Sequence, residues 1–202
     1  MKRSLVFASI AISLLLAASP VLAQLAQVNK ITFNLTPQPK FVNCLGVEGG
    51  ATPTATVTVK RGKLHDTLTI TASNLQPNLG FDLFTMQNTN LLANGQPDPN
   101  FKNFGLAWYQ TDLQADENGN AQTTINTILL DQIFGFDPAV SLAPTNSFHV
   151  GFWFNNPNDA AACGFSGTTP FNGEHNAGPN AMISLPSATT GLGPLCTKSS
   201  CP

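Results

Sequence analysis

Two neighbouring segments of the chain alternate strictly between apolar residues and threonines. Residues 54–60 read Thr-Ala-Thr-Val-Thr-Val-Lys, and residues 66–72 read Asp-Thr-Leu-Thr-Ile-Thr-Ala. Successive side chains of a β-strand point to opposite faces, so each segment has one apolar face and one threonine face. Threonine is β-branched and suits strands while keeping the solvent face polar. The loop 61–65 has hairpin length, and the sequence therefore predicts an antiparallel hairpin with one buried face.

Six more strand candidates lie between turns rich in glycine and proline, and no amphipathic helix is evident after residue 23. They are Lys30–Leu35, Phe81–Gln87, Leu106–Gln114, Ala121–Leu130, Ser147–Phe154 and Ala181–Leu185. Asn156 suits an N-cap and Pro157 suits the first helical position, so Pro157–Ala162 is expected to be one short helix, with a plain loop as the alternative. These patterns predict an all-β fold. We expect an antiparallel β-sandwich, immunoglobulin-like or a small barrel, with long loops.

Two of these predictions are more specific. Leu106–Gln114 and Ala121–Leu130 flank Asp116–Asn120, whose Asn-Gly pair is typical of a type I′ hairpin turn. We therefore expect these two segments to pair with each other. Lys30–Leu35 is expected to add an edge strand.

One corner of the sequence carries a resemblance to a known architecture. Leu75, Pro77 and Phe81 have the spacing of a leucine, a proline two residues on and an aromatic residue six residues on. Residues 68–83 resemble the strand, corner and strand that connect the two sheets of fibronectin type III and related immunoglobulin-like sandwiches. Those domains usually have tyrosine at the third place, whose hydroxyl bonds back to the backbone, and Phe81 cannot do this. The resemblance implies the sandwich architecture and no particular activity.

Residues 1–23 have the parts of a secretory signal peptide. Lys2 and Arg3 precede an apolar stretch of 14 residues, Leu5–Ala18, and Val21-Leu22-Ala23 supplies small residues before Gln24. A membrane-spanning helix needs about 20 apolar residues, so we expect cleavage rather than anchoring. The expected mature chain is a single domain, residues 24–202, with a short C-terminal tail, secreted to an extracellular or periplasmic location.

All four cysteines follow this signal. They are Cys44, Cys163, Cys196 and Cys201, and no pair has the Cys-x-x-Cys spacing of a zinc or redox motif. An even number of cysteines in an oxidising compartment predicts disulfides, and three connectivities are open. We favour pairing Cys44 with Cys163 and Cys196 with Cys201.

The polarity of the chain comes from uncharged groups. Charged residues make up 10% of the 202 residues, against about 25% in an ordinary soluble protein. The formal net charge is −2 and becomes −4 once Lys2 and Arg3 are removed, which excludes a nucleic-acid binder that works through a basic surface. At 42% hydrophobic residues, the chain has enough apolar side chains to bury a core.

No motif of a known catalytic class occurs in the sequence. There is no Gly-x-Ser-x-Gly, Walker loop, dinucleotide fingerprint or His-Glu-x-x-His. Residues 94–100 and 116–120 offer hard oxygen ligands for calcium, but neither has the EF-hand pattern, and turn formation explains both. Carboxylate chemistry is left open, because nothing in the spacing selects a pair of acids.

The segment Phe148–Phe154 contains the main candidate site. Alternation places its phenylalanines and valine on the core face and His149 and Trp153 together on the opposite face, with Gly151 between them. An outward tryptophan needs a cover, which is a ligand, a partner or the protein's own loop 172–179. In the functional interpretation, His149, Glu174 and His175 converge on a metal or line a polar pocket with Trp153 as a stacking floor. In the structural interpretation, which we favour, the loop simply packs on Trp153.

These observations predict an exported, non-enzymatic module that acts at a surface, in a matrix or on a ligand. The alternative is a carbohydrate- or small-molecule-binding pocket protein, hydrolytic or metal-binding, centred on His149, Trp153, Glu174 and His175. We expect no cofactor, no bound metal, no nucleic acid and no membrane span in the mature chain. The expected partner is a surface, a protein or a glycan.

Overall fold

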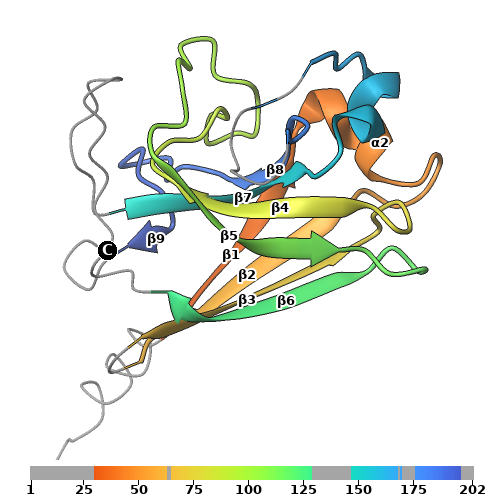
Figure 1. Cartoon of the computed structure of the whole chain (residues 1–202). Helices are drawn as coiled ribbons and strands as arrows, with labels where there is room; N and C mark the ends of the chain where they lie inside the picture. The colour runs from red at the N-terminus through yellow and green to blue at the C-terminus, as the bar shows by residue number, and fades with distance from the viewer. Residues whose placement is uncertain (1–29, 63–64, 129–146, 168, 170–175, 197–202) are drawn as a thin grey trace, which may run out of the picture.

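The fold is a single antiparallel sheet that curls into a nearly closed barrel (Figure 1). The computed structural model describes residues 30–62, 65–128, 147–167, 169 and 176–196. Eight strands follow the order β5-β4-β7-β8-β1-β2-β3-β6, and the short strand β9 pairs with β7 outside this path. The strands are β1 (Lys30–Pro37), β2 (Thr54–Lys60), β3 (Asp66–Ser73), β4 (Gly80–Met86), β5 (Ala107–Gln114), β6 (Ala121–Ile128), β7 (Ser147–Phe154), β8 (Asn180–Ser184) and β9 (Leu195–Cys196). The predicted all-β antiparallel class is confirmed, in its barrel form.

The threonine-rich hairpin forms as its alternation predicts. β2 and β3 pair antiparallel, with Val57 opposite Ile70 and Val59 opposite Leu68. These four apolar side chains are fully buried, while the threonines between them are partly or fully exposed. The period-two pattern alone therefore predicted correctly which face of the hairpin is buried and which is exposed.

The expected pairing of β5 with β6 is wrong. These two strands are the opposite ends of the sheet order, with β5 bonded to β4 and β6 bonded to β3. The β5–β6 turn keeps its own hydrogen bonds, from Gly119 N to Asp116 O and from Asp116 N to Asn120 O, but its two ends also bond to the corner between β3 and β4. Leu75 N donates to Gly119 O next to the β3–β6 pairing, and Ala115 N donates to Leu79 O next to the β4–β5 pairing. Gly119 has a positive φ of 73° and Asn118 does not, so the turn is not of type I′.

β1 is an interior strand rather than the expected edge. Its residues Lys30–Leu35 pair with β2, and its last residues, Leu35–Pro37, pair with β8. One strand thus joins the half of the sheet that contains β2, β3 and β6 to the half that contains β8, β7, β4 and β5. This shared strand makes the two halves one continuous sheet.

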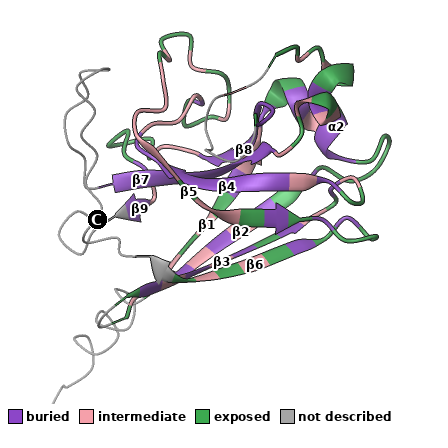
Figure 2. Ribbon diagram, viewed as in Figure 1, coloured by how far each residue is buried: buried purple, intermediate pink, exposed green. Residues whose placement is uncertain are grey.

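The barrel is filled by the apolar faces of most strands, and a second apolar cluster lies on the other face of β4 and β7. Phe148, Val150, Phe152 and Phe154 belong to the main core, as alternation predicts. The second cluster consists of Phe84, Met86, Leu91, Trp153, Ala177 and Ile183. Every residue of β7 is therefore buried, and Figure 2 shows its neighbours β4 and β8 as almost entirely buried too.

Short helices and one disulfide close the end of the barrel that lies beyond β7. The 3-10 helix η2 (Pro157–Cys163) begins at the expected place, where the Asn156 side chain accepts a hydrogen bond from Asn158 N. The 3-10 helix η1 (Pro39–Phe41) and the α-helix α2 (Val42–Leu45) were not expected from the sequence. Cys44 of α2 is bonded to Cys163 of η2, which confirms one predicted disulfide. Cys201 lies outside the described residues, so the other pairing stays a prediction.

A disulfide is consistent with an oxidising compartment. Among the described residues, no helix has the length and apolar character needed to span a membrane.

Candidate functional site

A cavity of about 830 Å³ opens beside the start of β7, between two long loops. One loop, residues 87–106, connects β4 to β5, and the other, residues 185–194, connects β8 to β9. The lining includes polar uncharged side chains from both loops and from β7, chiefly Asn88, Thr89, Asn100, Asn103, Ser147 and Ser187. Leu91, Leu92, Phe101 and Leu192 add apolar surface. The site thus combines apolar walls with hydrogen-bonding groups, as small-molecule pockets do.

Backbone and side-chain hydrogen bonds fix the base of loop 87–106. Gln87 N donates to Leu106 O, and the Gln87 Oε1 atom accepts from Leu106 N at 2.8 Å. One residue further on, Asn88 N donates to Phe104 O at 2.9 Å. The two ends of the loop are therefore hydrogen-bonded to each other where the loop leaves the sheet, and this fixes its position.

A carboxamide network fastens the same loop to the barrel. The side chains of Gln38 and Asn90 exchange two hydrogen bonds of 2.8 and 2.9 Å, and Gln38 also donates to Asn180 of β8. Asn180 in turn donates to the carbonyl groups of Phe152 and Met182. Gln38 and Asn180 are buried, and a buried amide is costly unless it is bonded, so this network holds the loop in one register.

The second loop folds back over β7. β9 pairs with the first two residues of β7, Ser147 and Phe148. A Cβ atom on Gly193 would overlap the carbonyl group of Phe148 and would lie 3.0 Å from His149 Cδ2. Only glycine allows this approach, which brings the loop directly against the His149 ring.

His149 lies at the buried base of the cavity. Its side chain is 2% exposed, and its Nδ1 atom lies 3.1 Å from Ser184 O and 3.0 Å from Ser184 Oγ. A carbonyl oxygen can only accept, so we assign the ring proton to Nδ1 and the lone pair to Nε2. No hydrogen-bond partner for Nε2 occurs within the described part of the chain. His149 is also one of the residues that line the cavity.

Burial lowers the pKa of His149 from 6.5 to about 4, because desolvation penalises the imidazolium. The hydrogen bond to the Ser184 carbonyl opposes this change but does not cancel it. The ring is therefore neutral throughout the neutral and mildly acidic range. His149 therefore adds no positive charge to the lining of the cavity in this range.

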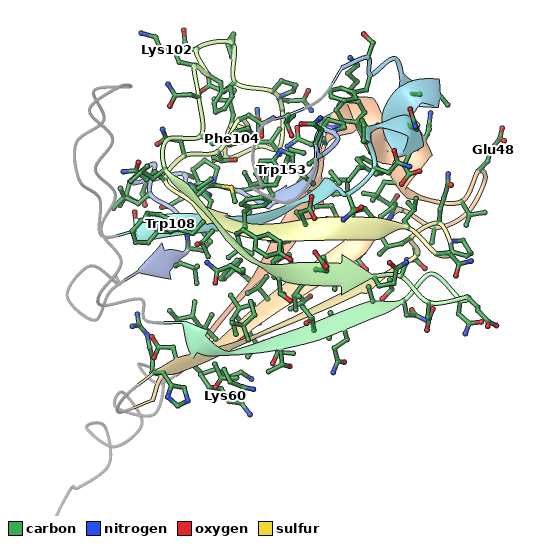
Figure 3. All side chains as sticks on the ribbon, viewed as in Figure 1. Glu48, Lys60, Lys102, Phe104, Trp108 and Trp153 are labelled. Carbon is green, nitrogen blue, oxygen red and sulfur yellow. A yellow bond between two sulfur atoms is a disulfide. The ribbon has the colours of Figure 1, made fainter. Side chains whose placement is uncertain are left out.

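Charged groups are few around the cavity. Asp98 and Lys102, both on loop 87–106, are the lining residues that carry charge at neutral pH. Asp98 Oδ1 accepts a hydrogen bond from Asn100 N at 2.8 Å, so this carboxylate also shapes the loop. Lys102 lies at the far end of the loop in Figure 3. With one charge of each sign, the walls favour a ligand without net charge.

The other predicted site residues lie elsewhere. Trp153 is 1% exposed and is not among the lining residues, because Phe84 and Phe104 pack edge-on against its ring with centroids 5.1 Å away (Figure 3). Ala177 of the loop 172–179 belongs to the same cluster. Gly151 does not leave an open gap, since Asn180 and Ile183 fill the space above it. Glu174 and His175 lie outside the described residues.

Turn formation accounts for both calcium candidates. The Asp116 carboxylate accepts from Asn118 N and Asn120 N, each at 2.8 Å, and Asn94 Oδ1 accepts from Gln96 N. In the described part of the chain, no three His, Cys, Asp or Glu side chains are grouped so that they could hold a metal ion.

The sequence singled out His149, which lines the cavity, but it did not indicate the two loops that form the walls. Residues 87–106 are rich in asparagine, glycine and proline, which signals loop structure but not where the loop lies. The one usable signal was the length of this connection between two strands, because long loops without regular structure are often binding elements.

The chain matches no protein-family model, no curated protein and no solved structure in the comparisons made.

Proposed function

We propose that this chain is an exported binding module whose cavity takes a small, neutral, hydroxylated molecule such as a mono- or disaccharide. The observation that carries the proposal is the position of His149, a buried neutral imidazole at the base of a loop-lined cavity. Its Nε2 lone pair accepts a hydrogen bond from a ligand hydroxyl group. No catalytic step is part of the proposal.

The size of the cavity supports this assignment. Small-molecule sites usually measure between about 300 and 1,000 Å³, and a volume of about 830 Å³ falls within that range. The walls come from two loops that are anchored on the barrel, so the site is formed before a ligand arrives. A preorganised site spends little of its binding energy on ordering loops.

The chemistry of the walls supports a hydroxylated ligand. Carboxamides such as Asn100 and Asn103 both donate and accept hydrogen bonds, which suits hydroxyl groups that do the same. His149 Nδ1 bonds to Ser184, which leaves Nε2 as the ring atom that can accept a hydrogen bond from a ligand hydroxyl group. Phe101 and Leu192 offer apolar surface to the less polar side of a sugar ring.

The environment of His149 favours binding over catalysis. A general base works best when its pKa lies near the operating pH, and a pKa of about 4 makes His149 a weak base at neutral pH. Its Nδ1 atom bonds to Ser184, and the described residues include no carboxylate bonded to this ring. A catalytic triad would require that second partner.

The test is a titration of the isotope-labelled protein with a panel of neutral mono- and disaccharides, followed by amide chemical shifts. The proposal predicts shifts confined to residues 87–106, 147–149 and 185–194. Leu192→Arg should abolish them, because Leu192 is 46% exposed at the cavity and a large charged side chain would fill its mouth.

The matched control is Val47→Arg, which makes the same kind of change at an exposed residue outside the cavity lining. The control should bind as the unmodified protein does. A panel without any shift, or shifts that persist in Leu192→Arg, would refute the proposed site.

A further inference from the structure

The cavity beside β7 has a buried base and an exposed mouth. Three polar side chains, Gln87, Ser147 and His149, are buried members of the lining, next to the buried residues Leu91 and Gly193. The polar three lie on β7 or directly after β4, so the base rests on the central strands of the sheet. The exposed lining residues all belong to the loops 87–106 and 185–194. The two loops therefore form the mouth.

Two exposed leucines lie at this mouth, one on each loop. Leu92 is 39% exposed and Leu192 is 46% exposed, and both line the cavity. The described residues include two other exposed large apolar side chains, Val47 and Tyr109, and neither of these lines the cavity. An isolated exposed leucine is ordinary, but two leucines from separate loops at one opening form a local apolar surface.

The apolar surface at the mouth includes two smaller side chains. Ala93, next to Leu92, and Ala188, on the same loop as Leu192, are exposed lining residues too. We call these four residues the apolar rim. The rim is continuous with the cavity, because all four residues line the same hollow as His149.

Hydrogen-bonded turns fix the backbone of both leucines. Leu92 O accepts from Gly95 N at 2.8 Å. Leu192 O accepts from Ser187 N at 2.9 Å, and Leu192 N donates to Thr190 Oγ1 at 3.3 Å. The turns hold the apolar rim in place before any ligand arrives, so its exposure does not result from a frayed loop end.

A ligand that fills this cavity meets different chemistry at its two ends. Apolar groups at the base would desolvate the His149 ring nitrogen without offering it a hydrogen bond, which is unfavourable. Hydroxyl groups at the mouth would leave Leu92 and Leu192 in contact with water or with polar atoms, and burial of these side chains would contribute nothing. The favourable orientation places hydroxyl groups at the base and apolar groups at the rim.

We infer that the ligand is an amphiphile, a neutral sugar that carries an apolar aglycone such as an alkyl chain. This inference rests on the proposed function and adds an orientation to it. The sugar lies at the base, where its hydroxyl group donates to His149, and the aglycone lies across the apolar rim.

The same chemistry occurs in dissolved glycosides and in membrane glycolipids. The strength with which a protein binds a membrane scales with the apolar area that it buries there. Two leucines and two alanines offer little such area, and the ligand that fits this site is therefore a dissolved glycoside.

The test compares methyl and octyl glycosides of glucose, galactose and mannose in NMR titrations of the labelled protein, below the critical micelle concentrations of the octyl compounds. Burial of one methylene group strengthens binding by about fourfold, so the octyl glycoside should bind at least about tenfold more tightly than the methyl glycoside of the same sugar. Nuclear Overhauser contacts should join the octyl chain to the methyl groups of Leu92 and Leu192, and the sugar protons to the His149 ring.

The double variant Leu92→Ser, Leu192→Ser removes the two large side chains of the rim. Its readout is the ratio of the octyl to the methyl affinity, which should fall to about threefold or less once the chain has lost its apolar contact. Val47→Ser is the matched control, because Val47 is 54% exposed and lies outside the cavity lining. The control should retain the full ratio.

The outcomes separate this inference from the proposed function. Equal affinities for methyl and octyl glycosides, or a ratio that is unchanged in the double variant, would overturn the inference and leave the proposed function intact. A panel in which no glycoside binds would overturn both. Contacts between the octyl chain and His149 would overturn the assigned orientation. Sedimentation with phosphatidylcholine vesicles that contain a glucosyl lipid, without a gain for the dissolved octyl glycoside, would overturn the choice of a dissolved ligand.

Discussion

His149 is the residue whose environment departs most from its ordinary chemistry. It lies on a strand with both faces buried, it bonds to Ser184 through Nδ1, and it is one of the residues that line the cavity. A histidine packed only for structure would satisfy both ring nitrogens with protein partners. The unbalanced bonding of this ring is the reason that we connect it to a ligand.

The pKa of His149 makes a prediction about stability. The folded-state pKa of about 4 lies below the unfolded value of 6.5, so the unfolded state binds a proton first as the pH falls. Protonation of His149 in the unfolded state does not affect stability above pH 6.5. Between pH 6.5 and 4 it lowers the free energy of unfolding progressively, by about 3 kcal/mol in total. Urea unfolding at pH 7 and pH 4 measures it.

The comparison variant for that measurement is His149→Gln, which removes the titrating ring and keeps a polar side chain. The unfolding free energy of the unmodified protein should fall by about 3 kcal/mol more than that of the variant between the two pH values. His65→Gln, at an exposed loop position, should behave as the unmodified protein does. Parallel pH profiles for all three proteins would contradict the burial of a neutral His149.

At the scale of elements, the side chains on the two faces of a strand contribute differently to the free energy of unfolding. Phe152 of β7 is fully buried and its ring centroid lies 4.8 Å from that of Phe81. Phe152→Ala should therefore reduce the free energy of unfolding by about 3 to 5 kcal/mol, through lost burial and the cavity left behind. Thr69→Ala, on the partly exposed face of β3, should change it by no more than about 1 kcal/mol. Similar denaturation midpoints for the two variants would show that the faces are misassigned.

The sequence predicted the positions of individual strands better than it predicted which strands pair. Alternation is a local property, so β2, β3 and β7 could be located closely from side-chain pattern alone. Pairing is a property of the whole chain. The Asn-Gly turn after β5 indicates a reversal, but its two ends bond to the corner at Leu75–Leu79, and β5 and β6 lie at opposite ends of the sheet order.

The candidate site was predictable only in part, for a related reason. The pattern around His149 identified a polar residue on the second face of a buried strand, and the structure places that residue at a cavity. What covers the rest of this face is decided by tertiary contacts. Phe104, 49 residues before Trp153, packs on the tryptophan, and no local pattern in the sequence links the two.

At the scale of the whole molecule, one covalent bond joins distant parts of the chain. The disulfide between Cys44 and Cys163 spans 119 residues and ties α2 to η2 at the end of the barrel. In the chain-entropy model, a loop of this length contributes about 4 to 5 kcal/mol by restricting the unfolded state. The double variant Cys44→Ala, Cys163→Ala should lose about that much unfolding free energy in denaturant titrations. A loss below about 1 kcal/mol would show that this bond does not stabilise the fold.

The barrel as a whole presents two surfaces of different chemistry. The cavity loops extend from the half of the sheet that contains β4, β7 and β8, while β1, β2, β3 and β6 carry the outward threonines (Figure 1).

The most direct test of the binding-site account is the state of the His149 ring itself. Long-range proton–nitrogen NMR spectra of the labelled protein report the protonation of each imidazole nitrogen. The account predicts a proton on Nδ1 and a bare Nε2 from pH 5 to pH 8, and a change at Nε2 when a bound sugar hydroxyl donates to it. A His149 ring that titrates near pH 6.5, or one that carries its proton on Nε2, would contradict it.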